Sequence, residues 1–476
     1  MTDSLAPRLR NTALLVAGCF FMENLDGTIV TTAAPRIGRA LGVPSTSVGL
    51  VIAAYLVTLA VLIPLSGWMA ERFGARPIFL SAIAVFTLAS AACAASSTFA
   101  ELVLCRVLQG VGGAMMVPVG RFVVLARTGK SDVLRVISLL VWPALIAPVV
   151  APLAGGVIIT YASWPWLFLI NVPLGVVALA VAWRLVRSPR TATPAPLDRA
   201  GVVLTCGGLG AATWVAYLLS LTRIPWVQVA GWAAAAALLL AGAVRHLLRD
   251  RHPLVNLRTL RVPTFRISLG SGSLFWSAIT AVPFLLTLLF QDEFHWSPVK
   301  SGAVVLFVFV GNIAIKPATT PLLQRFGFRP IIAVATAGGA ATMVAAALLQ
   351  AATPLVVIAI VALLNGVGRS VSLTCYTTIC FSDTPPEQMR DANTLQATAQ
   401  QLSVGLAVPL AAVALRAGGP LAAILPGTPS AYSVAFVLLA LIALVATGAA
   451  LRLHPDAGAA VTRRREPDSE PVSASP

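Results

Sequence analysis

Six charged side chains interrupt long apolar stretches of this 476-residue sequence. They are Glu23, Asp26, Arg106, Arg121, Lys316 and Arg369. A charge at the depth of a lipid bilayer costs about 2.5 to 3.5 kcal/mol on insertion scales, so each of these residues needs a partner or a purpose. Buried acids can carry protons, and buried bases can bind anionic groups.

Glu23 and Asp26 are three residues apart, which puts both on one face of a helix and roughly 4.5 Å apart along its axis. Two nearby carboxylates repel each other in a medium of low dielectric constant, so one of them should hold a proton near neutral pH. This pattern predicts a proton-coupling pair. The alternative is a salt bridge to Arg106 or Arg121 that only ties helices together.

Arg106, Gln109, Gly110 and Gly113 also share one helical face. We expect this face to point inward, so that Arg106 either relays the protonation of the acids or simply neutralises them. Arg121 lies near the inner end of the same stretch, where snorkelling to the interface is the simpler explanation.

Lys316 and Arg369 have no acidic residue at their depth in the C-terminal half of the sequence. Because Lys and Arg are natural partners of carboxylates, we predict that they bind substrate, together with the polar residues Gln109 and Asn365. The alternative is that one of them crosses to the first-span acids and locks the halves together.

The elements that position these residues must lie in lipid, because 58% of the residues are hydrophobic and only 11% are charged. Fourteen stretches are long enough to cross a bilayer as helices, with twelve as the competing count. They are residues 12–34, 48–70, 78–97, 100–123, 136–159, 166–186, 200–220, 226–246, 267–290, 301–322, 331–350, 355–379, 393–414 and 431–451.

The basic residues predict the orientation. If both termini are cytoplasmic, 24 of the 33 Lys and Arg residues fall in inner loops and tails, five in outer loops and four within spans. Cytoplasmic loops retain Lys and Arg, so this orientation is favoured. The scatter of positive charge among short loops excludes a nucleic-acid-binding face. The six cysteines lie in apolar stretches without metal-ligand spacing, and we interpret them as small buried hydrophobes.

Two segments recur at nearly one offset. Residues 71–78 (ERFGARPI) match residues 324–331 (QRFGFRPI) at six of eight positions, and residues 108–113 (LQGVGG) resemble residues 364–369 (LNGVGR). A parallel repeat of six-span halves follows, with two extra spans between them. The first pair predicts a gating latch, whose glycines allow tight turns and whose arginines bond helix-terminal carbonyl groups. Its residues are Gly67, Glu71, Arg72, Gly74, Arg76, Arg325, Gly327 and Arg329.

Over nearly its whole length the sequence resembles the major facilitator superfamily, in particular the fourteen-span drug:proton antiporter group (EmrB/QacA type) and its MdtD-like branch. The motifs that carry the resemblance are residues 25–35 (LDGTIVTTAAP), 67–76 (GWMAERFGAR), 106–110 (RVLQG), 147–156 (APVVAPLAGG), 164–166 (WPW) and 171–175 (NVPLG). Thr31 replaces the usual Asn, Glu71 the usual Asp, and Ala147 and Ala151 the usual glycines. The fourth motif is the antiporter signature, with Pro148, Pro152, Gly155 and Gly156 as its characteristic residues.

The resemblance implies an all-α polytopic membrane protein with the major facilitator fold, in which two six-helix bundles flank two extra central helices. We expect a cytoplasmic N-terminus (residues 1–11), an N-terminal bundle (12–186), a linker with the extra helices (187–266), a C-terminal bundle (267–453) and a disordered cytoplasmic tail (454–476).

The expected function is a proton-coupled exporter of small molecules that works by alternating access in a bacterial inner membrane. One proton is nearly sufficient, because a hundredfold concentration costs about 2.7 kcal/mol and one charge crossing 100 mV supplies about 2.3. The alternatives are an exporter of organic anions such as citrate-like carboxylates or metal chelates, and a transporter-derived receptor without flux. We expect a monomer that is not an enzyme, with no cofactor, no metal site and no histidine in a polar cluster.

Overall fold

The computed structural model describes residues 7–125, 133–186, 198–220, 224–250, 253, 257–385, 388–424, 430–454 and 457. Every regular element in these ranges is a helix, as expected for an all-α chain. Twelve helical segments in the described ranges are long and apolar enough to cross a membrane. Large apolar side chains such as Leu88, Leu238 and Val445 are exposed on the outside, which fits surroundings of lipid.

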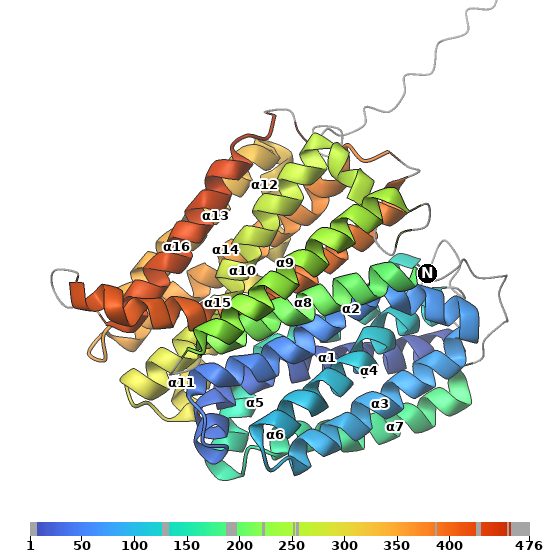
Figure 1. The fold of residues 1–476 in the computed structure, drawn as a ribbon, viewed down its shortest axis with the longest axis horizontal. Helices are drawn as coiled ribbons and strands as arrows, with labels where there is room; N and C mark the ends of the chain where they lie inside the picture. The colour runs from blue at the N-terminus through green and yellow to red at the C-terminus, as the bar shows by residue number, and fades with distance from the viewer. Residues whose placement is uncertain are drawn as a thin grey trace, which may run out of the picture.

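The N-terminal helices form one group, drawn in blue to cyan-green in Figure 1. They are α1 (Pro7–Ala40), α2 (Gly49–Phe73), α3 (Ala75–Ala95), α4 (Phe99–Leu125), α5 (Val133–Tyr161), the short α6 (Trp166–Leu169) and α7 (Asn171–Leu185), with the short η1 (Ser45–Val48) before α2. Within this group α1 packs on α5, α2 on α4, and α3 on both α4 and α7.

The C-terminal helices form a second group, drawn in yellow-green to red in Figure 1. They are α10 (Pro263–Leu288), α11 (Pro298–Ala314), α12 (Lys316–Phe326), α13 (Phe328–Ala347), α14 (Leu355–Ser382), α15 (Met389–Ile424) and α16 (Ala431–Ala450), with the short η2 (Leu257–Arg261) and η3 (Leu289–Glu293). In this group α11 packs on α14, α13 on α14 and α16, and α10 on α15.

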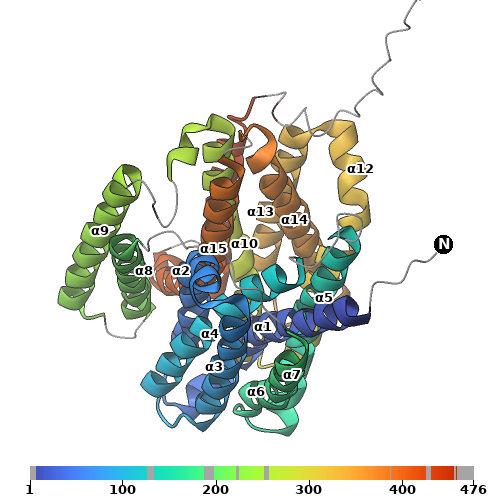
Figure 2. The same ribbon diagram turned by 90° about the vertical axis from the view of Figure 1, so that its right-hand side faces the viewer.

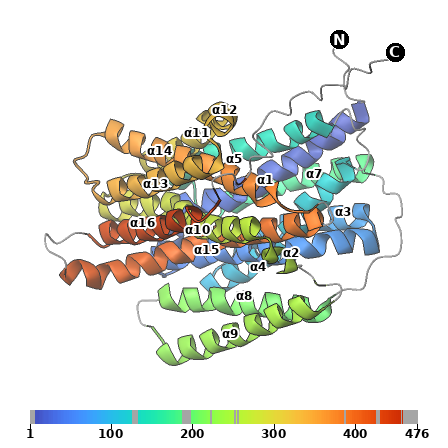
Figure 3. The ribbon, with the colours of Figure 1, turned by 90° about the horizontal axis from the view of Figure 1, so that it is seen from above.

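Between the groups in sequence stand α8 (Arg199–Ser220) and α9 (Trp226–Arg249), which pack on each other. Figures 2 and 3 show this pair at one edge of the molecule. Helix α8 contacts both α2 and α15, so the extra helices lie beside a junction of the two bundles and outside both of them.

All fourteen predicted spans coincide with helices. The spans at 136–159 and 200–220 correspond to α5 and α8, which are not among the twelve segments that qualify by length and composition, so a count of fourteen crossings stays a prediction. The predicted span 301–322 is two helices, because Pro317 has no backbone N–H to continue α11 through Ile315. Helix α1 begins at Pro7, inside the segment predicted as a cytoplasmic N-terminus, and nearly all of the predicted tail lies outside the described residues.

The two bundles meet along α5 with α11 and along α2 with α15. A Cβ atom on Gly156 of α5 would lie 2.6 Å from the carbonyl oxygen of Pro298, and one on Gly405 of α15 would lie 3.1 Å from the backbone nitrogen of Val57. Glycine permits such close approach, because a side chain at Gly156 would displace the neighbouring backbone and one at Gly405 would crowd it. The side chain of Gln291 also donates a hydrogen bond of 2.9 Å to the carbonyl oxygen of Thr32. These contacts lie in the half of the bundles nearer residues 41–48 and 289–297.

Candidate functional site

A cavity of about 260 Å³ lies between the two bundles. Helices α1, α2 and α5 line it on one side, and α10, α11, α14 and α15 on the other. Its lining is mixed. Tyr55, Trp276, Phe284 and Phe309 contribute aromatic rings, while Thr28, Thr31, Gln400 and Gln401 contribute polar groups. Such a surface suits a small molecule with an apolar body and a few polar groups.

Among the described residues, two charged side chains line this cavity, Glu23 from α1 and Arg369 from α14. The buried Oε2 atom of Glu23 has no hydrogen-bond partner among the described residues. The guanidinium carbon of Arg369 lies 5.8 Å from the ring centre of Trp276 and 5.6 Å from that of Phe309, within range of cation–π attraction. No ion pair joins Arg369 to an acid in the described part of the chain, so each bundle presents one charge to the shared space.

Asp26 is not part of the cavity lining, although it lies three residues from Glu23. It is fully buried, and its Oδ2 atom pairs with the guanidinium of Arg106 at 2.5 Å. Its Oδ1 atom accepts hydrogen bonds from Gln109 (2.9 Å) and Asn171 (2.7 Å). Four helices, α1, α4 and α7 together with the neighbouring α3, thus close around this carboxylate.

Arg106 is held as firmly as its partner. It donates to the carbonyl oxygen of Val51 at 3.1 Å, and its guanidinium carbon lies 4.3 Å above the ring of Tyr55. It also donates to Gln109 at 2.7 Å, which in turn donates to Ser90 of α3 at 2.7 Å. The expected salt bridge between the acids and Arg106 therefore forms, through Asp26 alone.

The face that carries Arg106, Gln109 and Gly110 points inward, into the N-terminal bundle, and none of these residues lines the cavity. A Cβ atom on Gly110 would lie 2.8 Å from the carbonyl oxygen of Tyr55, so this face packs against α2. The charged side chain of Arg106 can be buried between closely packed helices, because Asp26 of the same bundle compensates its charge.

The repeated motif of the fourth and twelfth predicted spans performs the same task in both halves. Gln109 joins α4 to α3 through Ser90, and Asn365 joins α14 to α13 through a 2.9 Å hydrogen bond to Thr342. Both residues are buried and neither lines the cavity. Gln109 and Asn365 therefore connect helices within their own bundles. That they bind substrate stays a prediction.

Lys316 and Arg121 also lie outside the cavity lining. The Nζ atom of Lys316 donates to Thr374 of α14 at 3.2 Å, so Lys316 bridges α12 and α14. Arg121 is exposed, with its guanidinium 5.3 Å from the ring centre of Phe20. Of the residues expected to bind substrate, Arg369 alone borders the described cavity.

The two loops of the predicted latch share one backbone feature. Gly74 has a φ of 92° and Gly327 a φ of 76°, values that favour glycine. Arg76 donates a 3.0 Å hydrogen bond to the carbonyl oxygen of Trp183, near the end of α7. Arg72 and Arg325 are exposed, and Arg329 is half-buried. The side chain of Glu71 and the surroundings of Gly67 lie outside the described residues.

The four signature residues of α5 have separate surroundings. Pro148 lines the cavity, whereas Pro152 is buried against Gly302 of α11. Gly155 faces Thr32 of α1, and Gly156 faces Pro298 of the other bundle. The motif thus places small residues where α5 contacts both its own bundle and its neighbour.

Sequence reasoning missed three contributors. Asn171 completes the shell of Asp26, and Tyr55 lies between that shell and the cavity. The expectation that no histidine joins a polar cluster is wrong, because His246 lies between Asp198 and Asp250 at the ends of α8 and α9. The spacing of His246 and Asp250, four residues apart, was the signal that could have indicated it.

The helical architecture, the internal repeat and the charged cavity can be compared with known proteins. The profile of the Major Facilitator Superfamily matches residues 16–408. The chain belongs to the major facilitator superfamily. Members of this superfamily transport small molecules across membranes, so the chain is a multi-pass membrane transporter with small-molecule substrates.

Curated relatives from this superfamily include proteins named "Putative multidrug resistance protein MdtD" from Salmonella newport and Salmonella typhi. Each is 34% identical over 414 residues, which cover 84% of this chain and 85% of the relative. The MdtD-like resemblance of the motifs is therefore confirmed.

Solved structures of the superfamily share the fold at low identity. An auto-inhibited peptide transporter of the POT family has a TM-score of 0.66 at 16% identity, covering 96% of this chain and 98% of its own. A D-xylose-proton symporter has a TM-score of 0.63 at 13% identity, covering 91% of this chain and 97% of its own. These likenesses support the major facilitator fold alone.

Proposed function

We propose that this protein is a proton-coupled exporter of amphipathic small molecules that works by alternating access. The observation that carries the proposal is the cavity between the bundles, to which α1 contributes Glu23 and α14 contributes Arg369. When two bundles move relative to each other, a site that lies between them becomes reachable from the other side of the membrane. The proton gradient supplies the energy, so no cofactor is required.

Glu23 is the proton carrier in this proposal. Its Oε2 atom lacks a partner among the described residues and borders the space in which a substrate would bind. Asp26 is poorly suited to the same task, because its charge is already compensated by Arg106, Gln109 and Asn171. Protonating Asp26 would break a buried ion pair, whereas Glu23 has no ion pair among the described residues for protonation to break.

The sign of the substrate charge decides whether proton and substrate move in opposite directions or in the same direction. A cationic group and a proton compete for the Glu23 carboxylate, so each promotes release of the other, as antiport requires. An anionic group that pairs with Arg369 repels an ionised Glu23 and therefore favours its protonation. Proton and anion would then move together. Export driven by proton entry thus favours substrates with a cationic or neutral polar group.

The charge balance of the cavity also favours this assignment over the export of organic anions. Four basic residues at bilayer depth would have made an anionic substrate attractive. Arg106 is paired with Asp26, Lys316 bonds Thr374, and Arg121 is exposed outside the lining. One acid and one base remain in the described lining. Arg369 keeps the anion hypothesis as the second candidate, since no acid pairs with it in the described ranges.

Transport by proteoliposomes tests both candidates. Efflux of a cationic dye and of a labelled carboxylate is measured under an imposed pH gradient for the wild type, Glu23→Gln and the control Lys300→Gln, which changes an exposed residue in the first turn of α11. We expect Glu23→Gln to bind the dye more weakly, to exchange it still at high dye concentration, and to lose the gradient-driven component, while Lys300→Gln behaves as the wild type.

Unchanged dependence on the gradient in Glu23→Gln would reject Glu23 as the carrier. Carboxylate movement without dye movement would favour the anion exporter. Binding of either compound without flux would favour a receptor. The proposed setting is a bacterial inner membrane with both termini in the cytoplasm, which places loops 71–76 and 324–329 on the inner side.

A further inference from the structure

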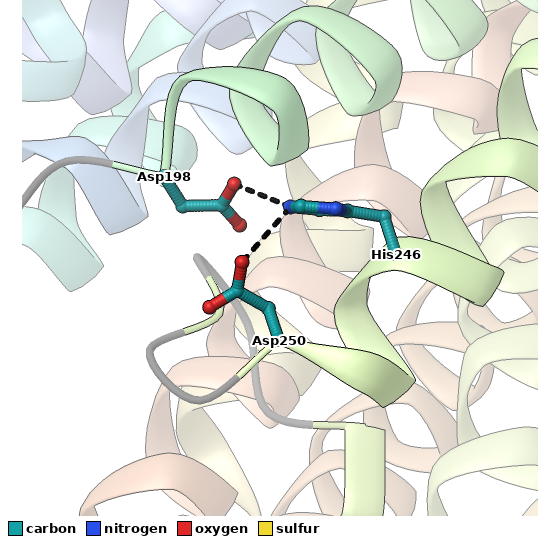
Figure 4. A group of neighbouring side chains, drawn as sticks. All are labelled: Asp198, His246 and Asp250. Atoms are coloured by element: carbon teal, nitrogen blue, oxygen red, sulfur yellow. Dashed lines mark hydrogen bonds and ion pairs between the residues drawn. The ribbon is translucent and has the colours of Figure 1, made fainter.

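Three side chains with metal-binding chemistry meet at one end of the α8–α9 pair, away from the transport cavity. Asp198 directly precedes α8, His246 lies in the last turn of α9, and Asp250 follows α9. The Nε2 atom of His246 is 2.6 Å from Oδ1 of Asp198 and 3.5 Å from Oδ2 of Asp250. Figure 4 shows both carboxylates directed at this nitrogen from different sides.

The convergence of two carboxylates on one ring nitrogen is the informative feature. An imidazole N–H donates one good hydrogen bond, yet two carboxylate groups face this nitrogen, as ligand groups do around a shared metal ion. The three candidate ligand atoms lie within 4.8 Å of one another. Metal–ligand bonds of about 2.0 to 2.2 Å place neighbouring ligand atoms roughly 3 to 3.6 Å apart. Small side-chain movements would therefore accommodate an ion.

The cluster is also built to hold its ligands in place. The side chain of Asp198 is only 3% exposed, and its Oδ1 atom accepts a 2.7 Å hydrogen bond from the backbone N–H of Gly201. Such bonds behind a ligand fix its orientation. The side chains of His246 and Asp250 are 26% and 34% exposed, which leaves an open side for water and for exchange of an ion.

We propose that Asp198, His246 and Asp250 bind one divalent transition-metal ion of the zinc class. One imidazole nitrogen with two carboxylate oxygens suits zinc, cobalt, nickel or manganese, whereas calcium and magnesium prefer oxygen ligands throughout. Three protein ligands leave at least one position for water, as in exchangeable sites. The ion is a regulator and not cargo, because none of the three residues lines the cavity.

The place of the site in the fold indicates what the ion would do. It would join the start of α8 to the end of α9, and α8 packs on α2 and α15. Helices α2 and α15 form one of the two junctions between the bundles. A bound ion would stiffen the helix pair beside this junction and so change the rate at which the bundles rearrange.

Cobalt binding to the full-length protein tests the site directly. The purified chain, with any affinity tag removed and metal stripped by a chelator, is titrated with Co²⁺ and followed by visible d–d absorption. We expect one Co²⁺ per chain, displaced by Zn²⁺. The variants His246→Gln and Asp198→Asn should bind at least tenfold more weakly, while His454→Gln, which removes a distant imidazole, should bind as the wild type.

Each variant is chosen to keep the helices intact. Asparagine caps helices as well as aspartate does, so Asp198→Asn retains the start of α8, and Asp250→Asn alters the more exposed ligand. Gel filtration shows whether each variant remains folded. The proposal is overturned if the wild type binds no Co²⁺ or Zn²⁺ at micromolar concentration, or if folded His246→Gln binds as the wild type does. Transport rates measured with and without Zn²⁺ then show whether the bound ion regulates transport.

Discussion

Glu23 and Asp26 lie on the same helix, yet the surroundings of the two carboxylates are opposite. Asp26 accepts hydrogen bonds from Arg106, Gln109 and Asn171, whereas Oε2 of Glu23 has no partner in the described ranges. A three-residue step on a helix turns a side chain by about 60°, which is enough to move it from the cavity into the bundle. The two acids therefore have different costs of protonation.

The first prediction concerns the stability that Asp26 provides. In Asp26→Asn the guanidinium of Arg106 stays buried without a counter-charge, which costs roughly 3 to 5 kcal/mol for a broken buried pair. We expect a clear fall in the unfolding temperature in detergent, with partial recovery in Asp26→Asn/Arg106→Gln. Glu23→Gln is the control and should unfold near the wild-type temperature. An Asp26→Asn protein of wild-type stability that loses gradient-driven transport would make Asp26 the carrier.

The second prediction concerns Arg369 as the cavity base. Replacing it in Arg369→Gln leaves Glu23 as the one charge in the described lining. Charges roughly 10 Å apart at an effective dielectric constant of about 20 interact by on the order of 1 to 2 kcal/mol, or about tenfold in affinity. We expect a cationic dye to bind about tenfold more tightly and a carboxylate more weakly in fluorescence titrations. Lys316→Gln is the matched control, and an equal effect there would place the binding site elsewhere.

At the scale of helices, the internal repeat has a physical explanation. Gly112 of α4 and Gly368 of α14 allow close approach to α3 and α13, since added Cβ atoms would lie 2.6 Å from the nitrogen of Phe86 and 3.1 Å from the carbonyl oxygen of Ala335. Gln109 and Asn365 add the interhelical hydrogen bonds. The repeated motif is a solution to packing two helices in lipid, where apolar surface alone gives little attraction between helices.

The third prediction tests the contact of α5 with α11. A leucine at Gly156 would collide with the backbone of Pro298, so Gly156→Leu should separate the bundles at that end. Spin labels are attached to Arg36→Cys and Lys300→Cys, and the distance between them is measured by electron paramagnetic resonance. We expect the distance distribution to contain an additional, longer component in Gly156→Leu. Gly338→Leu is the control, because a Cβ there meets nothing within 4 Å. Identical distance distributions in the two variants would mean that this contact does not hold the bundles closed.

The sequence is sufficient to predict the helices, since runs of about twenty apolar residues leave few alternatives in lipid, and the repeat fixes how the halves relate. It is not sufficient to place side chains within the bundle. The direction of Asp26 depends on Asn171, 145 residues away in sequence, and on a 2.7 Å hydrogen bond between them. Likewise, the cluster of Asp198 and His246 depends on how α8 and α9 meet, which the spacing of charges does not encode.

For the molecule as a whole, several close contacts between the described parts of the two bundles lie toward one end. Gly156 meets Pro298 and Gln291 meets Thr32 close to residues 289–297, while Gly405, at the middle of α15, meets Val57 in the half of α2 nearer residues 41–48. The latch loops belong to the opposite end, where Arg76 bonds α7 of its own bundle. The cavity should therefore be closed toward residues 289–297 and reachable from the side of the latch loops.

The last prediction tests this access. In a background whose native cysteines are replaced, Arg325→Cys marks the side of the latch loops and Lys300→Cys marks the other side. A cysteine at Thr28 or Gln400, both in the cavity lining, should react with a membrane-impermeant thiol reagent in the same vesicles in which Arg325→Cys reacts. Reaction only in vesicles that label Lys300→Cys would show that the resting state opens the other way. Because a closed end must open for export, an imposed proton gradient should raise labelling of Thr28→Cys from the Lys300 side, and Glu23→Gln should abolish that rise.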